Sequence, residues 1–544
     1  MREWGSSIAG AAFVAAAVHG WPAAGQTADP AAGSSKWGGF IDLEGKAGSE
    51  RSLGEIDVFI PLAQDDDTLF FSDLRLRGDT DSGNEGNFGL GVRHMLEDGW
   101  NLGGYAYFDH RRSPHDNTFN QVTLGAELLG RDWDFRVNAY QPVGDRSRDV
   151  DGLTSGGLSG SSIVIRQGTE EAMGGFDGEI GYRLPVFEPE SGIDLRVYGG
   201  AYHFTSGTEG VDDVTGPRAR LELVFDELPF AWEGSRLSLG AEWQHDGPRG
   251  SQGFVSARLR IPFSVFTGTS DQARSLSHQE RRMTDPIVRD VDVVTQAGAY
   301  GTRETATETA DGESLTVITS AAMASTADLN AALAAAGAHT VVLSGTFNTT
   351  GSVSVPAGQT VIGTGSLAVR TANNRRVEIV LTKEAGIVAE NNAVIFAMPL
   401  GDNARLSGMT VRNVQAGSGG RYAVSVQNQS GVVIENSTIS SYGASGGGVA
   451  VDALGSTNVI IRGNVISSRS DTAGTVGVRA TGATNITVAD NDFSLSTSSL
   501  KTVVAGSATT SFNAGSTGNT TNDGACLFGT PPTGSVGFDT ITCP

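Results

Sequence analysis

The sequence contains few cysteines, few lysines and, outside residues 1–25, no long hydrophobic run. A membrane-spanning helix needs about 20 consecutive apolar residues, so helical crossing of a membrane is excluded for that part of the chain. Lysine and arginine total 38 residues against 61 acidic ones, and the formal net charge is −23. Nucleic acid is therefore excluded as a partner, because phosphate binding needs clustered basic residues.

Only two cysteines exist, Cys526 and Cys543, in a Gly- and Pro-rich stretch without histidine. Two thiols alone do not form a structural zinc site, so the sequence indicates neither a metal site nor another cofactor. In an oxidising compartment they favour one local disulfide, which stabilises by about 3 kcal/mol through loop closure.

Glycine is abundant, with 74 residues, while charged residues make up only 18% of the chain. Serine, threonine, asparagine and aspartate supply most of the remaining polarity. This composition suits an all-β protein with many turns. At 544 residues the chain is too long for one core, so two or three domains are expected.

Residues 1–25 have the pattern of a secretory signal peptide. Arg2 precedes an apolar core, IAGAAFVAAAV, and Ala23-Ala24-Gly25 offers small residues for cleavage. This core is too short to span a bilayer as a helix. Residues 26–36 are expected to form a short periplasmic segment.

Residues 37–263 repeat one pattern, a run of about ten residues that alternates apolar and polar, followed by a turn. The predicted strands are 37–45, 54–62, 68–77, 86–95, 100–109, 119–129, 132–142, 174–184, 193–204, 217–225, 236–244 and 253–263. Twelve is an even number, as a single-chain membrane barrel requires. The connections alternate between short ones and longer polar ones, the longest covering residues 144–172, which is typical of periplasmic turns and external loops.

One face of these strands is apolar and the other carries charge. Arg136, Arg196, Arg258 and Arg260 are predicted to face the lumen, because each alternates with apolar neighbours. The pattern predicts a 12-stranded antiparallel transmembrane β-barrel over residues 37–266. A soluble barrel with a wet interior is the alternative.

Four consecutive strands resemble the β-domain of inverse autotransporters, the intimin and invasin group. The matching residues are Gly89, Gly91, Arg93 and His94, then Gly103, Gly104 and Asp109, then Leu124, Gly125, Ala126 and Glu127. The resemblance covers roughly residues 37–266 and implies a barrel that anchors the chain and exports a C-terminal passenger. No peptidoglycan-binding module is apparent before the first strand, and the immunoglobulin-like repeats of the group are not apparent after the barrel.

Residues 267–312 lack strand periodicity and are interpreted as a linker through the barrel. A short helical stretch is expected before Pro286. About 10–15 extended residues cross a ~30 Å hydrocarbon core, so the length suffices. A periplasmic linker, with a passenger that stays inside, is the alternative.

Residues 313–500 are predicted to form a right-handed parallel β-helix, similar to the pectate-lyase type. Val411, Ile439, Ile466 and Phe493 align at a nearly even spacing in the upper twenties, and such a period is typical of a solenoid. A helix at 327–336, with Ser325 or Thr326 as N-cap and Gly337 as stop, is expected to cap the first rung. Residues 501–544 are expected to form a C-terminal tail or cap.

Polar residues recur at matched positions of these repeats. Asn436, Gly463 and Asp490, and likewise Ser437, Asn464 and Asn491, are interpreted as turn or ladder residues, with a calcium or sugar surface as the alternative. Enzymes on this fold cluster carboxylates with basic residues. The candidates are Asp402, Asp452, Asp471, Asp490 and Asp492, with Arg405, Arg412, Arg462 and Arg479; His339 is expected at the surface. Their spacing indicates no catalytic site.

The sequence therefore predicts an outer-membrane protein that displays a β-helix on the cell surface, as an adhesin or a glycan- or matrix-binding protein. A polysaccharide-active passenger and a porin are the alternatives. The expected partners are outer-membrane lipid, periplasmic chaperones, the barrel assembly machinery and an extracellular ligand of unknown identity.

Overall fold

The computed structural model describes residues 36–188, 191–226, 228, 231–267, 276–290, 292–389, 395–415, 420–521, 525–528, 533–538 and 542–543. The predicted signal peptide and nearly all of the segment after it lie outside these residues, and so do the side chains of Cys526 and Cys543. The described chain divides into two compact units. No helix among the described residues is long and apolar enough to cross a membrane.

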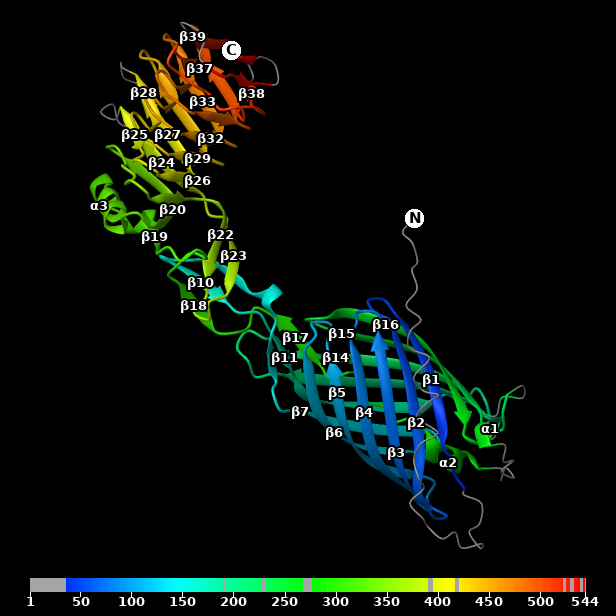
Figure 1. Ribbon diagram of the computed structural model, residues 1–544. Coiled ribbons are helices and arrows are strands. Elements are labelled where there is room, and N and C mark those ends of the chain that lie inside the picture. The colour runs from blue at the N-terminus through cyan, green and yellow to red at the C-terminus, as the bar shows by residue number, and fades with distance from the viewer. Residues whose placement is uncertain are drawn as a thin grey trace. The chain divides into compact units, whose positions relative to one another are not determined.

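The first unit is a closed antiparallel barrel, in which the strands follow one another around the wall in chain order (Figure 1). Its strands are β1 (Phe40–Gly48), β2 (Leu53–Gln64), β3 (Thr68–Asp79), β4 (Asn84–Met95), β5 (Asn101–Arg112), β6 (Thr118–Leu129), β7 (Trp133–Val143), β12 (Gly174–Arg183), β13 (Ile193–Thr205), β14 (Val214–Asp226), β15 (Arg236–Asp246) and β16 (Gly250–Pro262). The ring closes where β1 pairs with β16, Asp42 opposite Arg260. Closure leaves no open sheet edge, which a strand structure in lipid requires.

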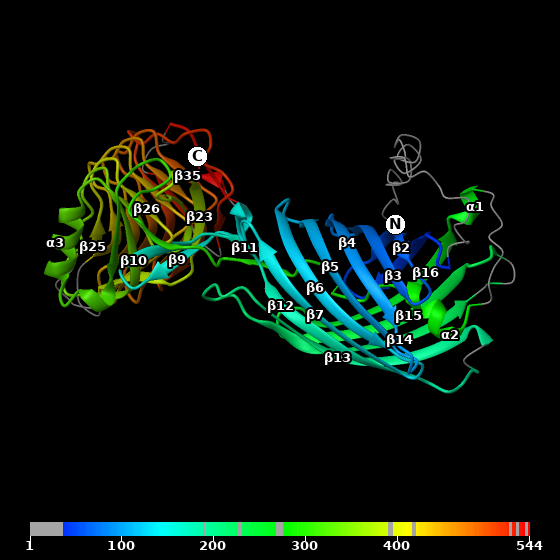
Figure 2. The ribbon, with the colours of Figure 1, turned by 90° about the horizontal axis from the view of Figure 1, so that it is seen from below.

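Outward side chains of the barrel are apolar and exposed, and inward ones are polar and buried. Leu124 and Val137 are 57% and 59% exposed, whereas their chain neighbours Thr123 and Arg136 are buried. Figure 2 shows the tilted strands β3–β7 of this wall. The predicted 12-stranded barrel is confirmed, with strand ends that differ by a few residues.

Three short helical elements and two short strands follow the barrel. They are α1 (Ser264–Thr267), α2 (His278–Arg281), η3 (Arg282–Thr284), β17 (Thr295–Gly298) and β18 (Arg303–Ala306). The sequence indicated no strand in this stretch, because β17 and β18 are too short to show periodicity.

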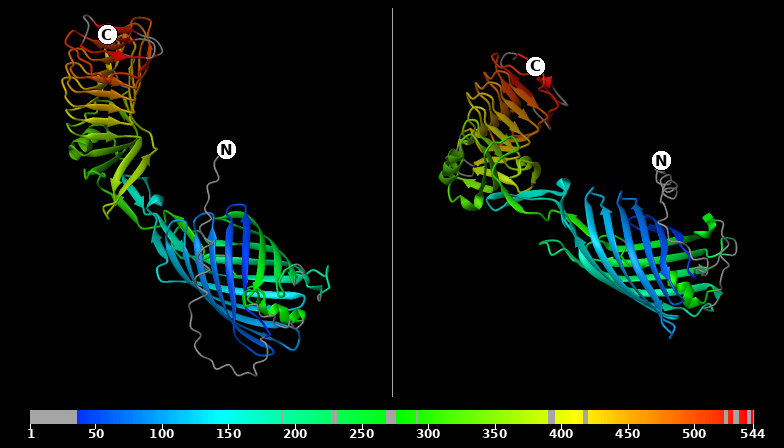
Figure 3. Two further views of the ribbon diagram at one scale, coloured as in Figure 1. Left: turned by 45° about the vertical axis from the view of Figure 1, so that its right-hand side comes forward. Right: turned by 60° about the horizontal axis from the view of Figure 1, so that its bottom comes forward.

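The second unit contains the β-helix, whose parallel strands stack in three rows (Figure 3). Its first part consists of β19 (Leu315–Thr319), η4 (Ser320–Ala322), α3 (Thr326–Ala336), β20 (Thr340–Thr349), β21 (Thr360–Ile362), β22 (Gly365–Arg370), β23 (Arg376–Leu381) and β24 (Ala385–Ala389). The rungs continue with β25 (Phe396–Pro399), β26 (Arg405–Ser407), β27 (Thr410–Gln415), β28 (Arg421–Ser425), β29 (Val433–Glu435), β30 (Thr438–Gly443), β31 (Gly448–Asp452), β32 (Ile460–Arg462), β33 (Val465–Ser470), β34 (Thr475–Arg479), β35 (Thr487–Ala489) and β36 (Asp492–Ser496). The last strands are β37 (Lys501–Gly506), β38 (Thr520–Thr521), β39 (Ala525–Phe528), β40 (Val536–Gly537) and β41 (Thr542–Cys543).

The alignment that predicted the solenoid is confirmed residue by residue. Val411 pairs with Ile439, Ile439 with Ile466 and Ile466 with Phe493, and all four are fully buried in one core. α3 caps the first rung, with Ser325 accepting from the Asp328 N–H. Rungs continue beyond residue 500, because β37 pairs with β34 in parallel. The tail expected from residue 501 thus begins with a further rung.

The connection between β7 and β12 differs most from the expectation of a polar loop. It forms β8 (Ser147–Asp149), η1 (Asp151–Leu153), β9 (Ser155–Ser159), β10 (Ser162–Arg166) and β11 (Thr169–Ala172). Residues 147–171 belong to the compact unit of the β-helix, although the barrel was expected to include them. Their strand partners lie far away in sequence, so local periodicity did not predict them.

Candidate functional site

The barrel lumen contains an extensive network of buried charged and polar side chains. A lumen segment, residues 276–290 and 292–294, lies inside it and contacts many strands. Met283 and Ile287 of this segment are buried in an aromatic cluster of the wall. Its other members are Trp37, Phe40, Phe59, Leu69, Phe71, Tyr105 and Tyr107. The segment is therefore packed against the wall and not only enclosed by it.

Ion pairs hold the first half of the lumen segment. Arg282 contacts both carboxylate oxygens of Asp134 on β7, at 2.7 and 2.9 Å. Asp285 accepts from Arg236 on β15 at 2.8 Å. Arg260 on β16 donates to the Thr284 carbonyl at 3.0 Å. Opposite sides of the wall are thus tied to the same few residues of the segment.

The second half of the segment is held in the same way. Arg289 contacts Asp109 on β5 at 2.9 Å, and Asp290 accepts from Arg218 on β14 at 2.7 Å. Asp292 faces three arginines of the wall. These are Arg51, Arg77 and Arg111. Because the Coulomb attraction between buried charges is weakly screened, these pairs fix the position of the segment along the lumen.

The four arginines predicted to face the lumen are all placed inside the barrel. Arg136 contacts Glu179 at 2.8 Å, and Arg196 contacts Asp134 at 3.3 Å. Arg258 contacts Glu44 on β1, and Arg260 contacts Asp42. Each therefore has an acidic partner on the wall, and the charges of the lumen are balanced within hydrogen-bond distance.

The glycines of the family motif make room for aromatic rings on neighbouring strands. A Cβ at Gly125 would lie 2.0 Å from the Tyr105 ring, and one at Gly91 would lie 2.3 Å from the Phe71 ring. Gly89 stands against Tyr107 at 2.3 Å in the same way. A side chain at these positions would displace the aromatic residues that contact the lumen segment.

The other motif residues take different places. Arg93 is buried, pairs with Glu127 at 2.6 Å and donates to the Met283 carbonyl at 2.8 Å. Gly103 packs against the Glu127 side chain, whereas Gly104 on the outer face has open space around it. His94 is exposed, and its Nδ1 lies 3.0 Å from the Thr68 hydroxyl.

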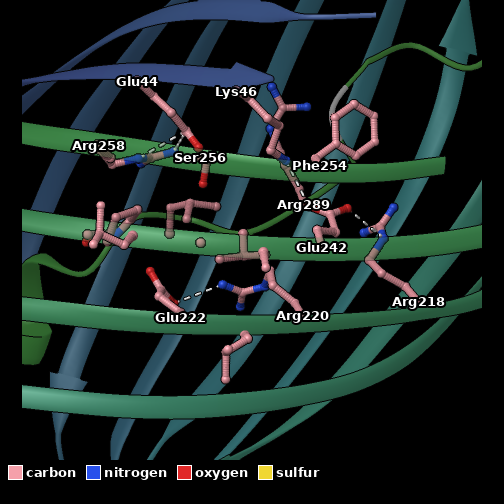
Figure 4. A pocket seen from close by; sticks show the side chains of 18 of the residues that line it. Glu44, Lys46, Arg218, Arg220, Glu222, Glu242, Phe254, Ser256, Arg258 and Arg289 are labelled. Carbon is pink, nitrogen blue, oxygen red and sulfur yellow. Dashed lines mark hydrogen bonds and ion pairs between the residues drawn. The ribbon is translucent and has the colours of Figure 1, made fainter. Parts of the chain in front are cut away.

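A small cavity remains between the lumen segment and strands β14–β16 (Figure 4). Its volume is about 110 Å³, and charged side chains line it. In the close-up, Glu44 points toward Arg258, Glu222 toward Arg220 and Glu242 toward Arg218. A buried water needs roughly 10–15 Å³ of such space, so the cavity has room for several waters but not for a chain segment.

The carboxylates considered for catalysis are spread over the β-helix. Asp452 is fully buried and is held by Arg479 at 2.7 and 2.5 Å. Asp471 accepts from the Tyr442 hydroxyl, and Asp402 from the Ser430 N–H. Asp490 and Asp492 are exposed at the end of one rung. His339 is exposed.

The candidate arginines are also spread over the β-helix. Arg405 and Arg462 both donate to Glu435, one from each side, while Arg412 is exposed on β27. Burial raises the pKa of Glu435, but hydrogen bonds from Arg462 and Arg405 outweigh it and leave the pKa below its ordinary value. Among the residues that the structure describes, no group of histidine, cysteine, aspartate or glutamate could hold a metal ion.

The matched polar residues of the repeats occupy turns and an internal ladder. Asn436, Gly463 and Asp490 have φ values of 49°, 62° and 55°, which places them in left-handed turns. Asn464 and Asn491 are buried, and the Asn464 side chain donates to the Asn491 side chain at 2.9 Å. The Ser437 N–H donates to Asn464 at 2.9 Å. These residues therefore satisfy backbone groups between rungs.

One surface arrangement was not found from the sequence. Phe396 stacks on Tyr422, with ring centroids 4.8 Å apart, and the Arg479 guanidinium lies 4.9 Å from the Tyr422 ring. We call Phe396, Tyr422, Asp452 and Arg479 the Tyr422 platform. Asp452 and Arg479 pair in register on successive rungs, so extending the repeat alignment to charged residues would have brought them together.

Comparison with known families agrees with this geometry. Residues 40–202 match the family model for the inverse autotransporter beta-domain. This stretch is an inverse autotransporter beta-domain. Residues 400–526 match the model for a right-handed beta helix region, so the β-domain carries a β-helix as its passenger. It lies in the outer membrane and displays the passenger outside the cell.

Three solved structures have some similarity to the chain, at low TM-scores. One is an outer membrane channel from Pseudomonas putida F1, at 14% identity over 41% of this chain and 93% of that chain, with a TM-score of 0.30. KdgM porin has 8% identity over 40% and 97%, with a TM-score of 0.25. Outer membrane phospholipase A from Escherichia coli has 12% identity over 42% and 93%, with a TM-score of 0.25. No curated protein matches the chain.

Proposed function

We propose that the displayed β-helix is an adhesive binding domain whose ligand is a glycan or a glycan-bearing matrix. The barrel serves as its anchor in the outer-membrane lipid. The lumen segment supports an anchor over a porin, because its ion pairs and buried apolar residues occupy the lumen and leave small cavities such as the one of Figure 4. Export through the periplasm makes periplasmic chaperones and the barrel assembly machinery the expected transient partners.

The observation that carries the binding proposal is the Tyr422 platform. The Tyr422 ring is partly exposed and is fixed from one side by Phe396. The Arg479 Nη1 lies 3.3 Å from the Tyr422 hydroxyl, and the buried Asp452 carboxylate orients the guanidinium from below. Burial lowers the pKa of Arg479, but the hydrogen bond to Asp452 and the negative charge of Asp452 outweigh this effect and raise the pKa above its ordinary value. The guanidinium therefore stays charged.

This arrangement suits sugar recognition. A flat aromatic face packs against apolar faces, and a planar guanidinium recognises carboxylates and sulfates with paired hydrogen bonds. Holding both groups in place before binding reduces the entropy lost on binding. Acidic glycans, which present sugar rings together with carboxylate or sulfate groups, are therefore the preferred ligand class.

Whole cells that produce the full-length protein would be labelled and applied to an array of neutral and acidic glycans. We expect binding to acidic glycans, and Tyr422→Ala or Arg479→Ala should weaken it about tenfold, which corresponds to about 1.4 kcal/mol. Tyr442→Ala is the matched control, because Tyr442 is another partly exposed tyrosine with arginine and aspartate neighbours, on β30. Equal binding by the Tyr422 variant and the parent would contradict the platform as the contact site.

The alternative function, a polysaccharide-active enzyme, is tested by a different measurement. Asp452, the most buried candidate carboxylate, accepts hydrogen bonds from Arg479 on both of its oxygens. Purified full-length protein would be incubated with the same acidic polysaccharides. Release of oligosaccharides that is lost in an Asp452→Asn variant would replace the binding proposal by a catalytic one.

A further inference from the structure

The long connection of the barrel contributes a hairpin to the base of the β-helix unit. β9 and β10 pair with each other through the Gly160 turn, where φ is 60°, and β10 then pairs with β18 (Figure 1). In this pairing Ile163 lies opposite Ala306 and Ile165 opposite Glu304. Residues before the lumen segment and residues after it therefore form one sheet.

A second hairpin, β22–β23, covers this sheet. Figure 2 shows β9 and β10 near β23. The two sheets enclose an apolar core, which we call the base sandwich. Its buried residues are Ile163, Ile165, Ala306, Val342, Leu367, Val369, Val377, Ile379 and Leu381. Four distant stretches of chain thus share one core: residues 155–166, 303–306, 340–349 and 365–381.

The contacts inside the base sandwich are close. Ile163 and Ile165 are fully buried. A Cβ at Gly156 on β9 would lie 2.3 Å from the Ile379 side chain, so the two sheets meet without room for a side chain there. At the edge, Arg375 in the β22–β23 turn pairs with Asp149 at 3.0 Å and also with Asp151.

The sandwich also covers the outer face of the first long strand of the solenoid. On β20, Val341 and Leu343 point into the solenoid core, whereas Val342 belongs to the core of the sandwich and is 1% exposed. Three consecutive buried valine and leucine residues are typical of a strand covered on both faces. Without the hairpin β9–β10, the base sandwich would lose most of one of its two sheets.

We propose that the hairpin β9–β10 is a docking platform, encoded within the barrel domain, on which the base of the passenger folds. The hairpin lies between two barrel strands and closes through its own short turn, so it depends on no passenger residue for its own pairing. β18 follows the lumen segment by only a few residues. Pairing β18 with a hairpin that is already present removes a large loop-closure cost from the first step of passenger folding.

Two substitutions test the platform in the full-length protein on intact cells. Ile163→Asn together with Ile165→Asn removes the apolar face of β10. Val164→Asn is the matched control, because Val164 is on the same strand, on the other face and half-buried. We expect the double variant to keep a heat-modifiable barrel and an exported passenger, while the passenger is digested by trypsin about tenfold faster or more. Parental resistance in the double variant would overturn the proposal.

A cross-linking experiment covers the case in which the double variant fails to fold. Val164 and Thr305 are directly opposed in the β10–β18 pairing, so Val164→Cys with Thr305→Cys allows a disulfide. Val164→Cys with Arg303→Cys is the out-of-register control. In a pulse-chase, the 164–305 link, identified by mass spectrometry, should appear before the C-terminal rungs resist trypsin. A link that forms only after full resistance would show that the hairpin docks onto a finished passenger and would overturn the proposal.

Discussion

Arg282 and Asp134 are 148 residues apart in the chain and form a two-point ion pair inside the barrel, at 2.7 and 2.9 Å. Both side chains are almost completely buried, and Arg196 contacts the same carboxylate at 3.3 Å. A buried carboxylate is costly without cationic partners, so the wall and the lumen segment stabilise each other through this contact.

Replacing Arg282 by methionine should therefore loosen the lumen segment. Removing one partner of a buried pair costs about 3 kcal/mol, because the remaining charge is left desolvated. We expect the folded gel band of the full-length protein to be lost at a lower temperature, and the ion conductance in planar bilayers to rise. Arg112→Met is the control, since the Arg112–Asp116 pair is exposed at the rim. Unchanged melting and conductance in the Arg282 variant would show that the pair does not hold the segment.

Glycine at position 125 should be required for barrel assembly. A valine there would collide with the Tyr105 ring, which lies 2.0 Å from the position of its Cβ, and with Asn138 at 2.5 Å. We expect Gly125→Val to reduce the amount of heat-modifiable protein in the outer membrane at least several-fold. Gly104→Val, with nothing within 4 Å and on the lipid face of the wall, should assemble like the parent. Equal assembly of both variants would contradict the role of the lumen glycine.

The barrel and the solenoid were predictable because their periodicity is local. Alternation over each strand predicted twelve strands, and the regular spacing of the rungs predicted the pairing of Val411 with Ile439. Each signal repeats many times, so single irregular residues do not hide it.

The partners inside the lumen and the base sandwich were not predictable in the same way. Alternation indicates that a side chain such as Arg196 faces inward, but it does not say which residue of the lumen segment lies opposite. Likewise β10 is a short strand whose partner β18 comes only after the rest of the barrel and the lumen segment, and neither has a turn signal that links it to the other. Non-local pairing between short segments leaves no periodic trace in the sequence.

The stability of the passenger should fall at acid pH through Glu435. Its folded pKa is below the ordinary value of 4.5, so the pairs with Arg405 and Arg462 stabilise the fold above that pH. The contribution is lost as pH falls through the lowered pKa. Because both arginines are about half exposed, we expect a loss of only about 1 kcal/mol. Calorimetry of the full-length protein between pH 7 and pH 3 should show a smaller acid-induced drop for Glu435→Gln.

The control for this measurement is Glu384→Gln, at an exposed glutamate of the same passenger. Its unfolding temperature should follow the parental pH dependence. A Glu435 variant with that same dependence would show that the two arginines do not stabilise the charged carboxylate.

The internal asparagine ladder should contribute more to stability than any exposed polar residue of the rungs. Asn491 accepts from Asn464 at 2.9 Å, and its own amide donates to the Ile461 carbonyl at 2.9 Å and to Asn519 at 3.0 Å. Asn491→Ala removes these bonds and also the acceptor of the buried Asn464 N–H, which donates to the Asn491 side chain at 3.0 Å, at a cost of about 3 kcal/mol. Trypsin digestion of the full-length protein across a urea series should show passenger unfolding at lower urea. Ser494→Ala, on the exposed face of the same rung, should leave the urea midpoint of unfolding unchanged. The same midpoint for both variants would mean that water replaces the lost bonds.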